Sequence, residues 1–395
     1  MQVLVLNSGS SSLKFQLFYM PEATILCSGI IERIGLDDAI FSFKTDKDSI
    51  KVVQAIPNHK IGLEILSKQL LNNETGIIKS TDDINIVGHR VVHGGKHFTD
   101  TTEVTPTVKD KIKTLSSLAP LHNPANLEGI EVAEAIFPNA KQVAVFDTAF
   151  HQSIPEYAYK YAIPNKFSDE HNIRLYGFHG TSHKYVSEKT IEFLGKGHSK
   201  IITIHLGNGC SMTAIKDGKS IDHSLGFSPV NGLIMGTRSG DIDQSIIFHL
   251  ADKFGYSLSE INTLLQKKSG MLGLTGFSDL RDIQAEAEKG NKSCQLALQM
   301  NAYRIKKYIG SYAAILNGLD AIVFTAGIGE NSIDMRQRVC EDLDYLGINL
   351  DIEKNKVRPD KLTVINKENS KVKILVIPTN EELEIAKQSV KLFEN

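Results

Sequence analysis

The chain begins with a strand that breaks into a short polar turn and then continues as a second strand. Residues 3–6 are apolar, 7–12 form a turn of Asn, Ser and Gly, and 13–18 alternate between apolar and polar. Alternation with period two is typical of a half-buried strand, so the pattern predicts a β-hairpin. Its tip carries backbone N–H groups, hydroxyls and Lys14, which can hold phosphate oxygens without a helix N-terminus. An ordinary hairpin with a polar turn explains a single copy equally well.

The pattern recurs about half a chain later. Residues 201–206 are mostly apolar, a turn containing Gly207, Asn208 and Gly209 follows, and 212–216 resume the strand. A second hairpin turn is expected at 217–219, and a third glycine-rich turn at 326–331, after a strand over 321–325. Two strand–turn–strand units in one chain predict a duplicated domain in which each half supplies one phosphate-facing hairpin.

The chain has 395 residues, which is too long for one hydrophobic core and favours two or three domains. Strands and helices alternate, which predicts an α/β class with a mixed sheet in each half. The expected strands include 84–88, 142–146, 201–206, 321–325 and 373–377, and the expected helices are 122–136, 293–317 and 381–393. The longest of these helices ends at Asn317 and Gly318, a typical C-terminal cap. The boundary between the halves is expected after the strand that ends at Asp147, near 148–155.

Composition excludes several classes of protein. The hydrophobic content of 41% and charged content of 23% are those of a globular chain. A net charge of -2 gives no reason to expect nucleic acid or an anionic membrane as partner. The four cysteines are scattered without metal-ligand spacing, which indicates reduced thiols in a cytosolic protein. The first apolar run is cut at Asn7, so a signal peptide is not expected, and no apolar stretch is long enough to span a bilayer.

Two charged residues follow apolar strands, where α/β folds usually place their sites. Arg90 could present a guanidinium to a carboxylate or phosphate, or could form an ordinary surface salt bridge. Asp147 could hold a metal–nucleotide complex, or could cap a following helix. His89 and His93 lie on an extended segment and are not expected to be metal ligands.

Three further segments are dense in polar residues. His179 and His183 have helical spacing but lack the Glu of the zinc-protease motif, so His179 faces a ligand or is a structural histidine. Residues 232–243 combine three glycines with Arg238 and two Asp, which lets the backbone approach a ligand closely. Glu381 and its neighbour follow a strand and could add a carboxylate to the same site. Neither the P-loop motif nor the dinucleotide fingerprint is present.

Taken together and in order, these motifs resemble the acetate kinase family over essentially the whole chain. The matching segments are Asn7–Lys14, 89–95, 120–124, 146–151, 176–183, 205–209, 226–243, 327–331 and 379–382. The resemblance implies two duplicated ribonuclease-H-like α/β domains with mixed sheets flanked by helices, and an active site in the interdomain cleft. It implies an N-terminal domain of 1–150 plus 382–395 and a nucleotide-binding domain of 151–381. It also implies a cytoplasmic homodimer that uses Mg²⁺ or Mn²⁺, with ATP or ADP as co-substrate.

The resemblance also assigns a role to each matching position. The implied catalytic residues are Asp147, His179 and Arg238. Acetate would be bound by Arg90 and by an apolar pocket of Val92, Leu121, Phe178 and Pro229. The metal positions are Asn7 and Glu381. The ATP contacts are Lys14, His205, Leu206, Gly207, Asn208, Gly209, Asp279, Leu280, Arg281, Gly327, Ile328, Gly329, Glu330 and Asn331.

The implied reaction is reversible, direct in-line transfer of the γ-phosphoryl group of ATP to acetate, giving acetyl phosphate and ADP. A carboxylate nucleophile has a pKa of about 4 and needs no strong general base. The site must instead position the reactants and offset charge on the phosphoryl oxygens. We therefore favour Asp147 as a residue that orients magnesium-bound water rather than as a proton acceptor. Propionate or butyrate as acceptor, and a nucleotide-dependent switch without an acceptor, remain the alternatives.

Overall fold

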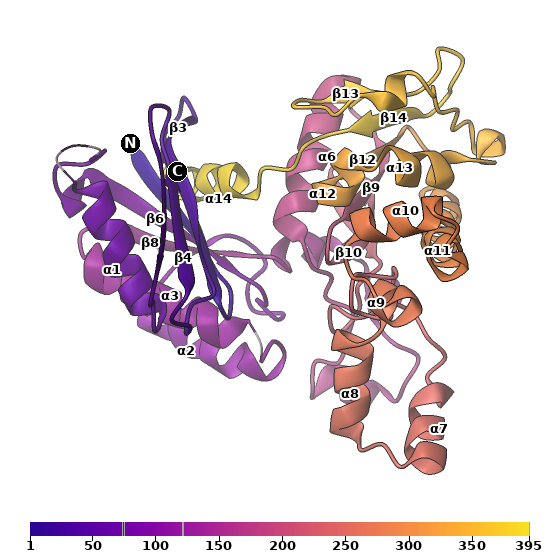
Figure 1. Cartoon of the computed structure of the whole chain (residues 1–395), viewed down its shortest axis with the longest axis horizontal. Coiled ribbons are helices and arrows are strands. Elements are labelled where there is room, and N and C mark those ends of the chain that lie inside the picture. Colours follow the sequence, from indigo (N-terminus) through magenta and orange to yellow (C-terminus); the bar gives the residue numbers. More distant parts are fainter. Residues whose placement is uncertain (73, 75, 121, 395) are drawn as a thin grey trace. The chain divides into compact units, whose positions relative to one another are not determined.

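Two separate groups of strands form two mixed sheets in the computed structural model, which describes residues 1–72, 74, 76–120 and 122–394 (Figure 1). Contacts divide the chain into a first unit, Met1–Phe150 with Asn380–Asn395, and a second unit, His151–Thr379. The expected domains, 1–150 plus 382–395 and 151–381, differ from these units only at Asn380 and Glu381, which group with the first unit. Each unit is described by itself.

The first unit is built on an eight-stranded sheet of order β5-β4-β3-β2-β1-β6-β8-β7. Neighbours from β1 to β5 are antiparallel, whereas β6 and β8 run parallel to β1. The strands are β1 (Gln2–Ser8), β2 (Ser12–Tyr19), β3 (Thr24–Glu32), β4 (Ala39–Lys44), β5 (Ser49–Gln54), β6 (Ile84–Val91), β7 (Thr102–Glu103) and β8 (Lys141–Phe146). The helices are α1 (His59–Leu70), α2 (Pro106–Thr114), α3 (Asn123–Ile136) and α14 (Glu381–Lys391), with short 3₁₀ turns η1 (Thr81–Asp83), η2 (Leu115–Ser117) and η3 (Ala149–Ser153), of which η3 crosses the boundary between the units.

Strand β1 is buried on both faces, which explains its unbroken apolar run. Leu4 and Leu6 pack in the core that includes α1 and α3. Val3 and Val5 pack in the opposite core, against Ile385 of α14. Helix α14, drawn in yellow, therefore lies on a sheet drawn in indigo although more than 200 residues separate them along the chain (Figure 1).

The second unit repeats the central part of this topology. Its six-stranded sheet has the order β11-β10-β9-β12-β14-β13, in which β9 to β11 are antiparallel neighbours and β12 and β14 run parallel to β9. The order β3-β2-β1-β6-β8 of the first sheet therefore corresponds to β11-β10-β9-β12-β14 of the second. The strands are β9 (Lys200–Leu206), β10 (Cys210–Lys216), β11 (Lys219–His223), β12 (Ala321–Thr325), β13 (Thr363–Val364) and β14 (Lys373–Val376).

The helices of the second unit connect and cover these strands. They are α4 (Glu156–Tyr159), α5 (Asn165–Asp169), α6 (Gly180–Leu194), α7 (Ser245–Phe254), α8 (Leu258–Lys267), α9 (Gly270–Thr275), α10 (Leu280–Glu288), α11 (Lys292–Leu316), α12 (Ala326–Asn331) and α13 (Ile333–Cys340), with 3₁₀ turns η4 (Asp344–Leu346) and η5 (Lys354–Lys356). Within the described residues, no helix combines the length and apolar character needed to cross a membrane.

Most expected elements are confirmed. Both hairpins form, with Asn7 opposite Lys14 in the first. The turn at Asp217 and Gly218 has positive φ at both residues, as a two-residue hairpin turn requires. Asn317 ends α11 in the left-handed conformation. The expected glycine turn at 326–331 is wrong, because these residues form helix α12, which begins the connection between the parallel strands β12 and β14.

Candidate active site

In the first unit, an arginine and an aspartate meet at the carboxyl ends of two parallel strands. Arg90 is near the end of β6, and Asp147 directly follows β8. Arg90 Nε donates to both carboxylate oxygens of Asp147 at 3.0 and 3.1 Å, and Nη2 donates to Oδ2 at 2.5 Å. Arg90 Nη1 donates to Asn7 Oδ1 in the first hairpin at 3.2 Å. The guanidinium, carried by β6, is thus held in one orientation by groups from the two neighbouring strands, β1 and β8.

Charge and burial compete around this pair. Burial disfavours the charged form of Arg90, but the carboxylates of Asp147 and Glu381 outweigh burial and raise the arginine's pKa. Burial also raises the pKa of Glu381, although Arg90 favours its ionised form. Lys14 forms an ion pair of 2.7 Å with Glu382 at the start of α14. Carboxylates therefore crowd the site, where an added cation would favour their ionised forms.

Two asparagines of α3, which the sequence analysis did not single out, fix the backbone of this site. Asn126 Nδ2 donates to the carbonyl of Ser8 at 2.6 Å, and its Oδ1 accepts from Val92 N at 3.0 Å. Asn123 makes two hydrogen bonds with the backbone of His93. Asn126 therefore ties the first hairpin to the segment after β6. The Asn-Pro-Ala-Asn run at 123–126 was the available signal, since two amides one helical turn apart share a face.

In the second unit, the hairpin turn Gly207–Gly209 lies against a histidine and an arginine. A Cβ on Gly209 would lie 3.4 Å from His179 Nε2 and 3.8 Å from Arg238 Nη1, so both side chains border this glycine. A Cβ on Gly236 would lie 2.2 Å from Asn208 Oδ1, so any larger residue here would force the Asn208 side chain to move. The glycine-rich segment that carries Arg238 is thus packed directly on the β9–β10 turn.

His179 is half-buried and connects to a chain of buried side chains. Its Nδ1 lies 2.8 Å from Ser211 Oγ, which also lies 2.7 Å from His183 Nε2. His183 Nδ1 pairs in turn with Thr203 at 2.7 Å. The ring of His205 stacks on His179 with centroids 4.4 Å apart. The helical spacing of His179 and His183 thus joins both residues to one serine, and no metal ion is needed to explain it.

Arg238 differs from Arg90 in its hydrogen-bond partner, which is a backbone carbonyl. Its Nη1 donates to the carbonyl of Pro229 at 2.8 Å, and among the described residues no Asp or Glu pairs with it. Burial lowers the pKa of Arg238 because no acidic neighbour compensates. A half-buried guanidinium without a carboxylate is suited to an anionic ligand.

The remaining candidate nucleotide residues also lie in the second unit. Asp279 caps α10 and pairs with Arg281 at 2.6 Å on the surface, and the carbonyl of Ser278 borders Gly236. Gly207 borders Ala326 at the start of α12, and Glu330 of that helix accepts from Thr379 N at 3.0 Å. The start of α12 therefore lies beside the β9–β10 turn.

The comparisons with known proteins identify the family. The model of the acetokinase family matches residues 2–387. The chain belongs to the acetokinase family. The acetate kinase of Flavobacterium johnsoniae is 64% identical over 395 residues and covers 100% of both chains, and that of Carboxydothermus hydrogenoformans is 49% identical over 398 residues, again with full coverage of both. The chain is thus a kinase that phosphorylates the carboxyl group of acetate with ATP.

Solved structures of acetokinases agree with the fold. The Porphyromonas gingivalis acetate kinase is 45% identical with a TM-score of 0.94, and a propionate kinase from Francisella tularensis is 44% identical with a TM-score of 0.93. Each comparison covers 99% of both chains. The predicted fold class of two duplicated α/β domains is therefore confirmed.

The structure divides the predicted site residues between the two units. The first unit holds Asn7, Lys14, Arg90, Val92, Asp147 and Glu381. The second holds Phe178, His179, His205–Gly209, Pro229, Arg238, Asp279–Arg281 and Gly327–Asn331. Val92 and Phe178 are buried and Pro229 is half-buried. Leu121 lies outside the described residues. Asp147 does not cap a helix with its side chain, which pairs with Arg90.

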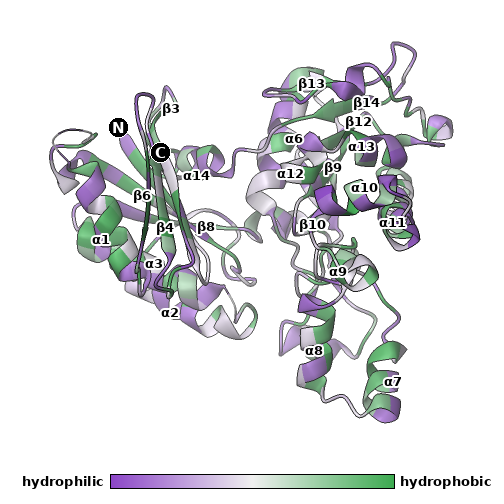
Figure 2. Cartoon of the chain, viewed as in Figure 1, coloured by the Kyte–Doolittle hydropathy of each residue, from purple (hydrophilic) through white to green (hydrophobic). Residues whose placement is uncertain are grey.

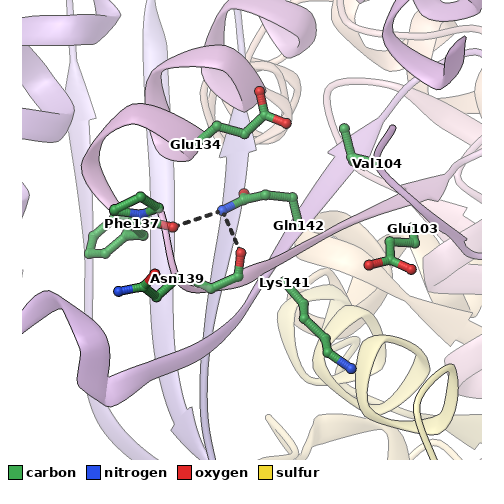
Figure 3. A pocket seen from close by; sticks show the side chains of 9 residues that line it. Glu103, Val104, Glu134, Phe137, Asn139, Lys141 and Gln142 are labelled. Atoms are coloured by element: carbon green, nitrogen blue, oxygen red, sulfur yellow. Dashed lines mark hydrogen bonds between the residues drawn. The ribbon is translucent and has the colours of Figure 1, made fainter. Parts of the chain in front are cut away.

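A hollow of about 400 Å³ in the first unit is separate from these residues (Figure 3). It lies at Lys141, the end of β8 opposite to Asp147. Gln142 spans its wall and donates from Nε2 to the carbonyls of Phe137 and Ala140 at 3.5 and 3.4 Å. The other amide atom, Oε1, lies 2.7 Å from His89 Nε2, so His89 is a structural histidine that faces away from Arg90.

Proposed function

We propose that this chain transfers the γ-phosphoryl group of ATP to acetate by reversible, direct in-line displacement, giving acetyl phosphate and ADP. The observation that carries the proposal is the difference between its two arginines. Arg90 is locked by Asp147 and Asn7, whereas Arg238 is half-buried beside His179 without a carboxylate partner. Transfer to an anionic acceptor needs one fixed cation for the acceptor and one available cation for the phosphoryl group.

On the acceptor side, we assign acetate binding to Arg90. The acetate carboxylate is already ionised near neutral pH, since such groups have pKa values of about 4, so no general base is required. Its charge must approach a charged phosphate, and the guanidinium of Arg90 offsets that repulsion. Val92, Leu121, Phe178 and Pro229 are the proposed apolar contacts of the methyl group. We assign Asp147 to hold Arg90 and to orient magnesium-bound water, roles that do not require it to accept a proton.

On the nucleotide side, we assign ATP binding to Lys14 and to three segments of the second unit, His205–Gly209, Asp279–Arg281 and Gly327–Asn331. Backbone N–H groups of a glycine turn can contact phosphate oxygens closely. Arg238 and the imidazole of His179 border the Gly207–Gly209 turn and would stabilise the charge on the equatorial oxygens during transfer. Each such donor typically contributes on the order of 10²- to 10³-fold in rate.

We assign Mg²⁺, with Mn²⁺ as the alternative, to Asn7 and Glu381. Oxygen ligands of this kind suit Mg²⁺, which keeps most of its water and adds only one or two protein ligands beside phosphate oxygens. The raised pKa of Glu381, caused by burial, fits a carboxylate that becomes fully ionised when a cation approaches. When bound, the ion would neutralise phosphate charge.

We further propose a homodimer that pairs through α7 and α8. Helix α7 has no buried residue, and Phe248 and Phe254 are both 65% exposed, followed by Leu258 at 72%. Figure 2 shows that much of the α7 ribbon is green, the colour of hydrophobic residues. A second copy of this chain would cover these apolar side chains.

Light scattering should give about twice the chain mass of 43.6 kDa. Phe248→Asp should halve the measured mass, whereas Tyr345→Asp, at another exposed position, should leave it unchanged. A monomeric wild type would contradict the proposal.

The acceptor acid is tested by trapping the acyl phosphate as a hydroxamate. With ATP and Mg²⁺, acetate should give more product per active site than propionate or butyrate. A pocket that discriminates by one methylene separates substrates by only about 1–3 kcal/mol, so side-by-side rates are needed. The Francisella propionate kinase at 44% identity makes propionate the second candidate. ATP hydrolysis without product from any acid would instead indicate a nucleotide-dependent switch.

Four free, buried cysteines fit the proposed cytoplasmic location.

A further inference from the structure

Two buried histidines outside the assigned site converge on one carbonyl oxygen, that of Phe178. His151 Nε2 lies 3.0 Å from this oxygen and His223 Nε2 lies 2.8 Å from it. A carbonyl oxygen can only accept, so both imidazoles must donate an N–H to it. Their rings pack edge to face with centroids 4.2 Å apart. Phe178 directly precedes His179, so the two donors act on the peptide group that leads into the catalytic histidine.

The hydrogen-bond partners settle the tautomer of each ring. The backbone N–H of Leu225 donates to His223 Nδ1 at 2.8 Å, so the proton of His223 is on Nε2. Ser220 Oγ lies 3.0 Å from His151 Nδ1 and can donate to it. Burial lowers the pKa of His151 to about 3 and that of His223 well below its usual value, in agreement with two neutral rings.

The backbone around Phe178 has an uncommon conformation. Gly177 has φ +74, and a Cβ there would lie 2.7 Å from the ring of His151. His179 has φ 57 and ψ 27, the left-handed region that non-glycine residues seldom adopt, at the N-terminus of α6. Such a conformation persists only where surrounding contacts determine it, and it points the imidazole toward Gly209 and Arg238.

We propose that His151 and His223 are positioning residues, whose two imidazole N–H groups clamp the Phe178 carbonyl and so hold His179 in place for phosphoryl transfer. The inference rests on the proposed function, because the role of His179 in transfer belongs to that proposal. It goes further in assigning a task to two histidines to which the proposed function gives no role. Loss of either donor should let the 177–179 segment relax and displace the imidazole.

The test compares two replacements at each histidine. In His223→Gln and His151→Gln, the amide nitrogen can take the place of Nε2 and still donate to the carbonyl. In His223→Leu and His151→Leu, no donor remains. We expect the Leu variants to lose about 10- to 100-fold in kcat, with KM for ATP within about threefold of wild type. The Gln variants should recover to within about fivefold of wild type.

A stability control separates positioning from unfolding. Val339→Ala removes two methyl groups from the buried face of α13 in the same unit and should lower the thermal midpoint without lowering kcat per folded molecule. Gln variants as inactive as the Leu variants would overturn the clamp, as would activity losses that follow the folded fraction alone.

A spectroscopic readout separates this inference from the proposed function. In protein with ¹⁵N-labelled histidine, His151 and His223 should both appear as Nε2–H tautomers with slowly exchanging protons, and His223→Leu should shift the His179 signals. Nδ1–H tautomers, or unchanged His179 signals, would overturn the clamp even in an active enzyme. Wild type that forms no acyl hydroxamate would refute the proposed function, whereas the tautomers would still test the clamp.

Discussion

Replacing Asp147 distinguishes a residue that holds Arg90 from one that accepts a proton. The two oxygens of Asp147 accept three N–H contacts from Arg90, which amount to two charge-assisted hydrogen bonds because Nε is shared. Asp147→Asn keeps one acceptor oxygen, so about one such bond is lost. Bonds to charged groups contribute about 1.5–3 kcal/mol, which predicts a decrease in kcat/KM for acetate of about 10- to 150-fold.

Asp147→Ala removes both bonds and leaves the guanidinium without its partner. Asp147 is 1% exposed, so the pair behaves as a buried one. Removing one partner of a buried ion pair costs about 3–5 kcal/mol. This cost predicts a decrease in kcat/KM for acetate of about two to nearly four powers of ten. Asn should therefore be clearly more active than Ala. A proton acceptor would lose its function equally in both variants.

The assay is hydroxamate trapping at saturating ATP with varied acetate, together with the thermal midpoint of each variant. Glu134→Gln serves as the control, because Glu134 forms a 2.6 Å ion pair with Lys109 away from the site in the same unit. That variant should stay within about twofold of wild type. Equal losses in Asp147→Asn and Asp147→Ala would refute the holding role, and so would full activity of Asp147→Ala.

Three other predictions follow from the same geometry. Arg238→Met should lower kcat by about 10²- to 10³-fold with little change in the thermal midpoint of unfolding, because the substitution removes no ion pair. A decrease in thermal midpoint large enough to explain the lost activity by unfolding would contradict this prediction. Asn126→Ala should lower the free energy of unfolding, measured in urea, by about 1–3 kcal/mol, because the backbone groups of Ser8 and Val92 lose their buried hydrogen-bond partner. Unchanged stability would argue against a role of Asn126 in joining the first hairpin to the segment after β6. The free energy of unfolding should fall from pH 8 to pH 5, because buried His89, with a pKa of about 4, stays neutral in the folded chain while the unfolded histidine takes up a proton below about pH 6.5. His89 alone contributes about 2 kcal/mol of this loss at pH 5, and buried His151 adds to it in the same direction; urea midpoints that rise toward pH 5 would contradict the prediction.

The sequence predicted the hairpins and the parallel strands because their patterns are local. Alternation at 13–18 and the glycines at 207–209 determine strand and turn without long-range information. Helix α12 was missed because its glycines favour a turn, and only the connection from β12 to β14 makes a helix the better solution.

The site was predictable where a residue type is unusual for its position. Arg90 and Asp147 follow apolar strands, and this placement made them candidates. The sequence could not show that they pair, since 57 residues separate them and only the parallel register of β6 and β8 brings them together. Asn126, Ser211 and His223 were missed for the same reason. Each acts through a partner distant in the chain, and no local pattern records that partner.

The most direct test of the account is formation of acetyl phosphate by the purified chain with acetate, ATP and Mg²⁺, in wild type and in Arg90→Ala. We expect the wild type to form acetyl hydroxamate in the trap and to show the reverse reaction, ATP formation from acetyl phosphate and ADP. Arg90→Ala should lose most kcat/KM for acetate. Wild type that hydrolyses ATP without forming hydroxamate, or Arg90→Ala with unchanged kcat/KM for acetate, would contradict the account.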